Sequence, residues 1–220
     1  MTHEIKNHWV IHPLPTDRPI SLRAIKPKGL QQPLFPQNRT YHPADYESSE
    51  DLKAAFERDV LQLNDIGLNV YAVMNMIRDD FRGGVAVRDL DITHRTTVLI
   101  DIDRVDVTSR PASDSEINAA FDLASNVASF LDTEGLHNPQ WVHSGNGAHL
   151  YYRISAIPQT QEITQDVERF LKGLAKKFNN GIVGIDTSVY NASRITKVIG
   201  TIARKGVESE ARPYRMARLV

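Results

Sequence analysis

The stretch Thr97-Val98-Leu99-Ile100-Asp101-Ile102-Asp103 decides the fold and is the starting point for the chemistry of this chain. Its apolar run predicts a buried strand over residues 97–102. Alternate residues of a strand face the same side, so Asp101 and Asp103 are expected side by side at the end of that strand. Two neighbouring carboxylates repel each other unless a cation separates them, and Mg²⁺ or Mn²⁺ is the natural partner for oxygen ligands. The alternative is a strand end that carries two solvated acids.

The composition excludes several classes of protein. The chain has 220 residues, a formal net charge of −1 and no cysteine. This length fits one domain, or one domain with a small accessory module. The lack of cysteine excludes disulfides, thiol nucleophiles and cysteine-based zinc sites, so no zinc is expected. Residues 1–13 lack the apolar core of a signal peptide, and no stretch reaches the ~20 apolar residues of a membrane span. We therefore expect a soluble, cytoplasmic protein without a membrane partner.

Charge is distributed unevenly along the chain. Residues 101–135 carry eight acids against two bases, whereas residues 194–220 carry seven bases against two acids. A basic segment beside an acidic centre suits a polyanion held near a metal site. An ordinary solvated surface would give the same pattern.

The first part of the sequence is rich in proline, with seven of the eleven prolines in residues 1–47. Proline opposes helix, so extended pieces and turns are expected here, with one alternating strand over residues 20–25. Ser48 is the expected cap of a helix that ends at Gly67. A strand is then expected over residues 69–77.

The second part is more regular. Ser113 and Glu116 form a capping box before a helix that Gly135 closes, and a second helix is expected over residues 161–178. Strands are expected over residues 97–102, 140–143, 148–154 and 197–203. The middle two are joined by the turn Ser144-Gly145-Asn146-Gly147, because Asn-Gly favours positive φ in hairpins.

The order β-α-β-β-α-β is that of the ferredoxin-like or RRM-like unit. The predicted fold class is therefore α+β, with an RRM-like module over residues 95–205 packed against an N-terminal α/β module over residues 1–94. The basic segment 206–220 follows, and it is suited to lead into further domains of a longer protein.

This topology predicts a meeting of three motifs. The strand with the two aspartates and the strand that begins near His149 are neighbours in the middle of the sheet. Asp186 lies in the loop after the second helix, and Arg194 and Lys197 follow it. Three carboxylates with phosphate oxygens and water complete an octahedral Mg²⁺, and two such ions roughly 3.5–4 Å apart support in-line phosphoryl transfer.

The glycine turn is also a candidate anion-binding site. Backbone N–H groups around Gly145 and Gly147 are suited to form a concavity that binds an anion. A protonated His149, with Arg194 and Lys197, adds positive charge for a triphosphate. Taken singly, each feature has an ordinary explanation, as a plain hairpin, a satisfied histidine or a surface ion pair.

Together these residues resemble the primase-polymerase branch of the archaeo-eukaryotic primase superfamily. Three motifs in the right order carry the resemblance: Val98-Leu99-Ile100-Asp101-Ile102-Asp103, then Ser144-Gly145-Asn146-Gly147-Ala148-His149-Leu150-Tyr151, then Asp186 followed by Arg194, Lys197, Gly200 and Thr201. The resemblance implies a catalytic domain over residues 1–220 that is a template-dependent nucleotidyltransferase. Its expected partners are single-stranded DNA template and primer, NTP or dNTP, and a helicase or other replication domain.

The resemblance also implies roles for single residues. Asp101, Asp103 and Asp186 would bind two Mg²⁺ or Mn²⁺ ions, and His149, Arg194 and Lys197 would contact the phosphates of the incoming nucleotide. Arg78 is a further candidate for the nucleotide or the template. The turn departs from the family, because Gly147 stands where many relatives carry the serine of a Ser-x-His motif. Ser144 or the backbone N–H groups of Gly145, Asn146 and Gly147 are the substitutes.

Two other functions remain open from the sequence. A non-catalytic RRM-like module would stack bases on aromatic residues of the central strands, for which only Tyr151 and Tyr152 are candidates. A metal-dependent nuclease would use similar carboxylates but needs no triphosphate pocket, so His149, Arg194 and Lys197 favour the nucleotide substrate.

Overall fold

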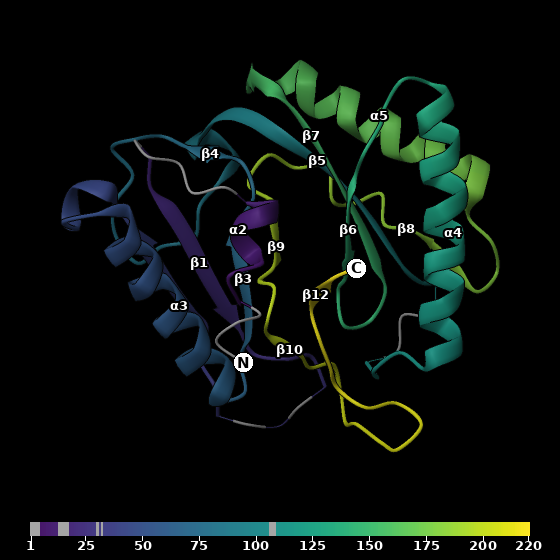
Figure 1. Ribbon diagram of the computed structural model, residues 1–220, viewed down its shortest axis with the longest axis horizontal. Coiled ribbons are helices and arrows are strands. Elements are labelled where there is room, and N and C mark those ends of the chain that lie inside the picture. Colours follow the sequence, from purple (N-terminus) through teal and green to yellow (C-terminus); the bar gives the residue numbers. More distant parts are fainter. Residues whose placement is uncertain (1–4, 13–17, 30, 32, 106–108) are drawn as a thin grey trace.

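The computed structural model describes residues 5–12, 18–29, 31, 33–105 and 109–220. Its strands form two main antiparallel sheets that lie next to each other, each with helices of its own (Figure 1). The α+β class predicted from the sequence is confirmed.

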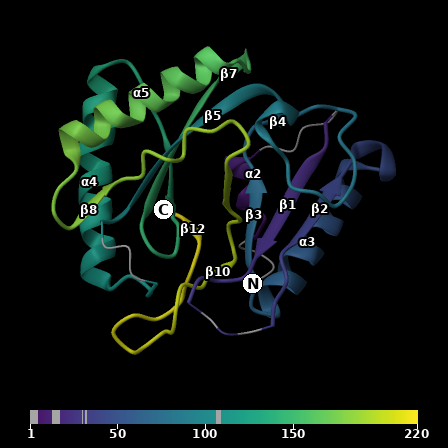
Figure 2. The same ribbon diagram turned by 180° about the vertical axis from the view of Figure 1, so that it is seen from behind.

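The first sheet has the order β2-β1-β3-β9, and all its neighbours are antiparallel. Its strands are β1 (Ile20–Ile25), β2 (Gln37–Tyr41), β3 (Asn69–Val73) and β9 (Ile195–Lys197). Helix α3 (Ser49–Asp65) packs on β1 and β3, as the view from behind also shows (Figure 2). The helix begins where predicted, since the Ser48 side chain accepts the N–H of Asp51.

The second sheet is built around the 13-residue strand β5 (Ile92–Arg104). One edge of β5 pairs with β7, which continues to β6 and β12; the other edge pairs with β4 at one end and β8 at the other. The further bounds are β4 (Met76–Ile77), β6 (Gln140–His143), β7 (Ala148–Pro158), β8 (Val183–Ile185) and β12 (Arg218–Leu219). The run β6-β7-β5-β8 is the strand order of the ferredoxin-like unit.

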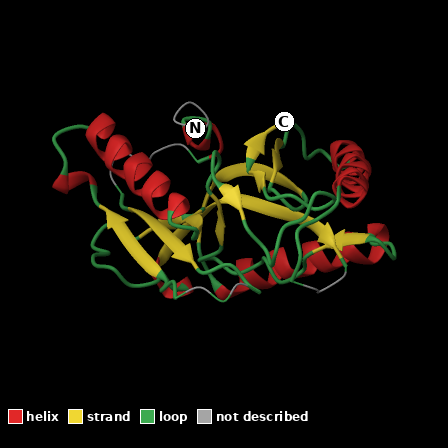
Figure 3. Cartoon of the chain, turned by 90° about the horizontal axis from the view of Figure 1, so that it is seen from below, coloured by secondary structure: helices red, strands yellow, loops and turns green. Residues whose placement is uncertain are grey.

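Two helices cover one face of this sheet. They are α4 (Asp114–Thr133) and α5 (Gln161–Phe178), which contact β5, β7 and β8 and each other. The predicted capping box is present, with Ser113 and Glu116 each accepting the other's backbone N–H. Ile100 and Ile102 are fully buried in the core that these helices cover. Asp101 and Asp103 alternate with them along the strand and therefore face the opposite side of β5. In the view from below the helices lie around the periphery of the strands (Figure 3).

Five short elements complete the described chain. They are helix α2 (His8–Ile11), the 3₁₀ turns η1 (Pro43–Asp45) and η2 (Asp89–Asp91), and the paired strands β10 (Ile202–Ala203) and β11 (Arg215–Met216). In the described part of the chain, every helix falls short of the length or apolarity that crossing a bilayer requires.

One predicted strand is wrong. The last strand of the β-α-β-β-α-β unit is β8 at residues 183–185, not residues 197–203, and residues 195–197 belong to the first sheet. The turn after α5 leads straight into β8, because the Asn180 side chain accepts the N–H groups of Ile182 and Val183. A three-residue strand shows no period that a sequence pattern can reveal.

The predicted strand over residues 69–77 is in fact two strands in two sheets. Asn75 lies at the break, where its side chain accepts the N–H of Thr96 at 3.1 Å and donates to the carbonyl of Ala192 at 2.9 Å. This buried amide replaces ladder hydrogen bonds at the point where the chain passes from β3 to β4.

Candidate active site

A cavity of about 380 Å³ opens where the first and second sheets meet. Its acidic residues come from β5, its histidine from β7, and its basic residues from β9 and the segments next to the first sheet. The chemically relevant lining residues are Lys26, Lys28, Asn69, Tyr71, Asp101, Asp103, Ser144, Asn146, His149, Arg194, Lys197, Arg204 and Lys205. The cavity thus combines most of the residues singled out in the sequence.

The pairing of β5 with β7 sets Asp101 opposite His149. The Nε2 atom of His149 lies 3.3 Å from the Oδ1 atom of Asp101, and its Nδ1 atom lies 3.0 Å from the hydroxyl of Tyr151. Burial opposes ionisation of Asp101, but the positive groups of His149, Arg194 and Lys205 outweigh it and keep the pKa of Asp101 below its usual value. Asp101 is therefore a carboxylate at neutral pH.

Asp103 lies in a less favourable environment. Burial, followed by the negative charge of Asp101, raises the pKa of Asp103 to about 7. Its Oδ1 atom is buried and has no hydrogen-bond partner among the described residues, and the Nζ atom of Lys205 lies 4.0 Å from Oδ2. A buried carboxylate oxygen without a partner, beside a second carboxylate, fits a hard divalent cation.

Asp186 contacts Asp101, but not Asp103, through a backbone hydrogen bond. Its N–H donates to the carbonyl of Asp101 at 2.8 Å, directly beyond the β8 pair Ile102–Ile185. Its side chain is exposed, and Oδ1 accepts the N–H of Ser188 at 2.8 Å. Among the described residues, no group of three or more histidine, aspartate or glutamate side chains is arranged to hold a metal ion.

The turn Ser144-Gly145-Asn146-Gly147 closes on itself. The Ser144 hydroxyl accepts the N–H of Gly147 at 3.0 Å and of Asn146 at 3.4 Å, and the N–H of Gly145 donates to His143. Its backbone donors therefore already have partners, and Ser144 and Asn146 line the cavity with their side chains. The residue with positive φ is Gly145, at 98°, rather than the Asn-Gly pair that the sequence favoured.

Lys197 projects from β9 and is buried. Its Nζ donates to Asn69 Oδ1 at 2.8 Å and lies 4.4 Å from the ring centre of Tyr71. Burial, followed by the positive charge of Arg204, lowers the pKa of Lys197 to about 7. A half-buried neighbour, Arg194, donates to the carbonyl of Ser188, and its Nε has no partner. Two cations thus face the two aspartates across the cavity.

Comparisons with known proteins bear on the fold. Neither the family models nor the curated proteins match this chain. Solved structures do match: a cyanophage S-2L primase-polymerase AEP domain, with a TM-score of 0.54 and 15% identity, covers 100% of this chain and 89% of that one. The primase RepB' matches at a TM-score of 0.53 and 12% identity, over 100% of this chain and 55% of that one.

A third match is the polymerase domain of Mycobacterium tuberculosis ligase D in complex with DNA, with a TM-score of 0.51 and 16% identity. It covers 91% of this chain and 74% of that one. This chain has the primase-polymerase fold. The family resemblance drawn from the three motifs is therefore confirmed at the level of the fold.

Four of the site residues predicted from the sequence are not among those that line the cavity: Gly145, Gly147, Asp186 and Arg78. Arg78 pairs with Asp80 at 2.7 Å and with Asp91 at 3.1 Å, and its guanidinium lies over the ring of Phe81. Arg78 is not among the residues that line the cavity. Its contacts are those of a residue that anchors η2.

Other lining residues were missed in the sequence. Lys26 and Lys28 follow β1, and Asn69 and Tyr71 lie on β3. Nothing in their local sequence marks them, because they reach the cavity only through the packing of the two sheets. Lys205 could have been proposed from the sequence, because it belongs to segment 194–220, where bases outnumber acids.

The basic residues of segment 194–220 include two groups with different positions in the primase-polymerase fold. Arg194, Lys197, Arg204 and Lys205 line the cavity. Arg212 and Arg215 instead pair with acids at the start of α4, namely Glu116 at 2.6 Å and Asp114 at 2.6 Å. Only the first group is available to a polyanion in the cavity.

Gly147 is required by a close approach to β5. A Cβ atom at this position would lie 2.2 Å from the carbonyl oxygen of Ile102 and 2.8 Å from Asp103 Oδ1. We expect Gly147→Ala to lower the free energy of unfolding by about 1–3 kcal/mol, because β5 must shift to admit the methyl group. Urea unfolding measures this. Gly181→Ala, where a Cβ meets nothing within 4 Å, is the control, and equal stability of the two variants would contradict the assignment.

Proposed function

We propose that this protein is a template-dependent nucleotidyltransferase, a DNA primase-polymerase that adds nucleotides from NTP or dNTP to a 3′-hydroxyl on single-stranded DNA template. The observation that carries the proposal is the buried, unpartnered Oδ1 of Asp103 beside Asp101, in a cavity shared with Arg194, Lys197 and Lys205. The solved structures that share this fold, a primase-polymerase, a primase and a polymerase domain in complex with DNA, support the same reaction class.

Asp101 and Asp103 are the residues that would hold Mg²⁺ or Mn²⁺, with two ions in the full mechanism. Asp186 lies in register beside Asp101 and would join them once its side chain releases the N–H of Ser188. Divalent ions bound there would supply the positive charge that activates a 3′-hydroxyl and stabilises the departing pyrophosphate.

The remaining residues act on the triphosphate. Lys197 and Arg194 face the aspartates from the first sheet and its loop, and Lys205 lies beside Asp103. Phosphate oxygens would accept charge-assisted hydrogen bonds from these groups. Lys197 would gain a proton as the triphosphate binds, because a neighbouring negative charge favours its charged form. Catalysis in this arrangement consists of positioning and charge neutralisation, without a covalent intermediate.

The two tyrosines on β7 weaken the alternative of a non-catalytic RRM-like module. Tyr151 is 1% exposed and Tyr152 is 2% exposed, so neither offers a ring face on which a base can stack. The central strands instead present two acids to the cavity.

The proposed function is tested by synthesis on primed and unprimed single-stranded DNA, with ribonucleotides and deoxynucleotides in separate reactions and with Mg²⁺ or Mn²⁺. Template-directed addition that stops on chelation is the expected result. No incorporation under any of these conditions would refute the proposal.

Calorimetric titration with Mn²⁺ separates the enzyme from a binding module, and incubation of labelled DNA without nucleotides would expose a nuclease.

His149 is expected to bind the incoming nucleotide rather than to support the fold. His149→Ala should raise the KM for the nucleotide about tenfold, the loss of one charge-assisted hydrogen bond to a phosphate. Steady-state extension kinetics measure it. His137→Ala, which removes an exposed histidine at the end of α4, is the matched control. A KM for the His149 variant equal to that of the control would contradict the role.

A further inference from the structure

A chain of polar side chains, buried in its middle and half-buried at its two ends, runs from the candidate active site to the N-terminal helix α2. It begins at Asp101 and His149, whose contact is 3.3 Å, and continues from His149 Nδ1 to the Tyr151 hydroxyl at 3.0 Å. Thr196 Oγ1 lies 3.0 Å from His12 Nε2, and the His12 ring packs edge-on against the Tyr151 ring, with 5.5 Å between ring centres. The residues come from four separate elements: β5, β7, β9 and the end of α2.

The acceptors in this chain determine its proton positions when both imidazole rings are neutral. The Asp101 carboxylate only accepts, so the proton of His149 is on Nε2 and its Nδ1 accepts from the Tyr151 hydroxyl. At the far end of the chain, the Thr196 hydroxyl contacts His12 Nε2. Because each ring nitrogen of His149 has a partner, these contacts select one tautomer and one ring orientation for its imidazole.

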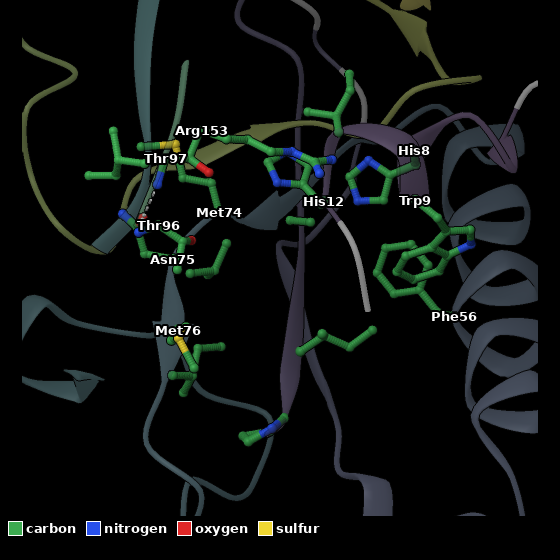
Figure 4. A pocket seen from close by; sticks show the side chains of 17 residues that line it. His8, Trp9, His12, Phe56, Met74, Asn75, Met76, Thr96, Thr97 and Arg153 are labelled. Atoms are coloured by element: carbon green, nitrogen blue, oxygen red, sulfur yellow. Dashed lines mark hydrogen bonds between the residues drawn. The ribbon is translucent and has the colours of Figure 1, made fainter. Parts of the chain in front are cut away.

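Helix α2 is fixed at the far end of the chain. His8 stacks on Phe56 of α3, with 5.6 Å between ring centres and 9° between ring planes. Arg153 of β7 donates to the carbonyl of Val10 in α2. Figure 4 shows His8 and His12 next to each other, between the ring of Phe56 and the residues Thr97 and Arg153. The helix thus bridges the two sheets where they meet.

His12 is held in its neutral form. Burial, followed by the neighbouring Arg153 and His149, lowers its pKa to about 3. A neutral imidazole has one donor and one acceptor nitrogen, which is what the end of such a chain needs.

We propose that Tyr151, Thr196 and His12 are positioning residues that hold the imidazole of His149 in the orientation and tautomer that present Nε2–H to the catalytic cavity. This inference rests on the proposed function for its kinetic consequence. It assigns the N-terminal helix a part in the active site, although none of its residues lines the cavity that holds the aspartates.

The decisive comparison is between two neighbouring tyrosines of β7. Tyr151→Phe removes the hydroxyl that contacts His149, whereas Tyr152→Phe removes a buried hydroxyl that has no hydrogen-bond partner. We expect Tyr151→Phe to raise the KM for the nucleotide about tenfold, with a smaller change in kcat, and Tyr152→Phe to leave both unchanged. Thr196→Val should reproduce part of the effect, and Thr196→Ser, which keeps the hydroxyl, should restore normal values.

A second measurement does not depend on catalysis. The ¹⁵N signals of His149, identified by their loss in His149→Gln, should show the Nε2–H tautomer in the wild type and a mixture of tautomers in Tyr151→Phe. An unchanged tautomer in Tyr151→Phe and Thr196→Val, with unchanged KM, would overturn the proposal. If the wild type does not synthesise DNA, the proposed function fails. The ¹⁵N comparison still decides whether Tyr151, Thr196 and His12 position the imidazole of His149.

Discussion

Asp103→Asn is expected to abolish nucleotide addition, lowering kcat by about 10³-fold or more, while the protein remains folded. The Asp103 carboxylate is the one whose buried oxygen lacks a partner, so its negative charge is the feature that a cation would use. Loss of one ligand charge from a site that stabilises a phosphoryl-transfer transition state removes several kcal/mol of that stabilisation. Asparagine keeps the shape of the side chain and removes only the charge.

Folding and catalysis should respond to this change in opposite directions. Asp103 lies half-buried beside Asp101, and their mutual repulsion disfavours the folded state. The thermal midpoint of Asp103→Asn should therefore equal or exceed that of the wild type. Asp122→Asn, at an exposed position of α4, controls for the loss of one negative charge. Extension rates for Asp103→Asn that match those of Asp122→Asn would end the assignment of Asp103.

Much of the second sheet could be predicted from the sequence because its signals are local. The apolar run ending in Asp101 and Asp103, the Ser113–Glu116 capping box and the Asn179-Asn180-Gly181 stop each depend on residues close in sequence. Such signals fix where a helix or long strand begins and ends. The same locality explains why α4 and α5 were found with nearly their observed bounds, whereas β5 extends beyond the predicted strand, over residues 92–104 rather than 97–102.

The remaining features depend on contacts distant in sequence. Residues 195–197 form a strand only because β3 offers them an edge, and Lys26 lines the same cavity as Asp103 only because two sheets pack together. The sequence analysis placed Asp186 near the other aspartates on the assumption that it lies in a loop after the second helix. In the structure, β8 runs alongside β5 and places Asp186 beside Asp101. The backbone position was thus predicted for the wrong reason, and the direction of the side chain could not be inferred from any pattern.

Lys197→Met is the second substitution with a large expected effect, and it should weaken nucleotide binding while making the protein more stable. The Lys197 ammonium faces the aspartates across the cavity and would donate to the triphosphate, so its loss should raise the KM for the nucleotide about 10- to 100-fold. Methionine fills a similar volume without a charge. The Asn69 oxygen keeps a partner, since it also accepts the N–H of Arg204 at 2.8 Å.

The gain in stability follows from the lowered pKa of Lys197. In the unfolded chain the pKa of this lysine is near its usual value of 10.5, but in the folded protein burial lowers that pKa to about 7. Between these values the unfolded state binds more protons, so wild-type stability rises with pH from about 7 to 10.5. Lys197→Met lacks that dependence and should be more stable at neutral pH, by on the order of 1 kcal/mol or more.

Urea unfolding at neutral pH and at about pH 9 tests the sign of this effect, with Lys176→Met on the exposed face of α5 as the control. The stability difference between Lys197→Met and the wild type should shrink as the pH rises, whereas that of Lys176→Met should not. A Lys197→Met protein that is less stable at neutral pH would mean that its contacts with Asn69 and Tyr71 outweigh the cost of burying its charge. The expected outcome instead identifies Lys197 as a group that destabilises the free protein because the bound triphosphate requires its charge.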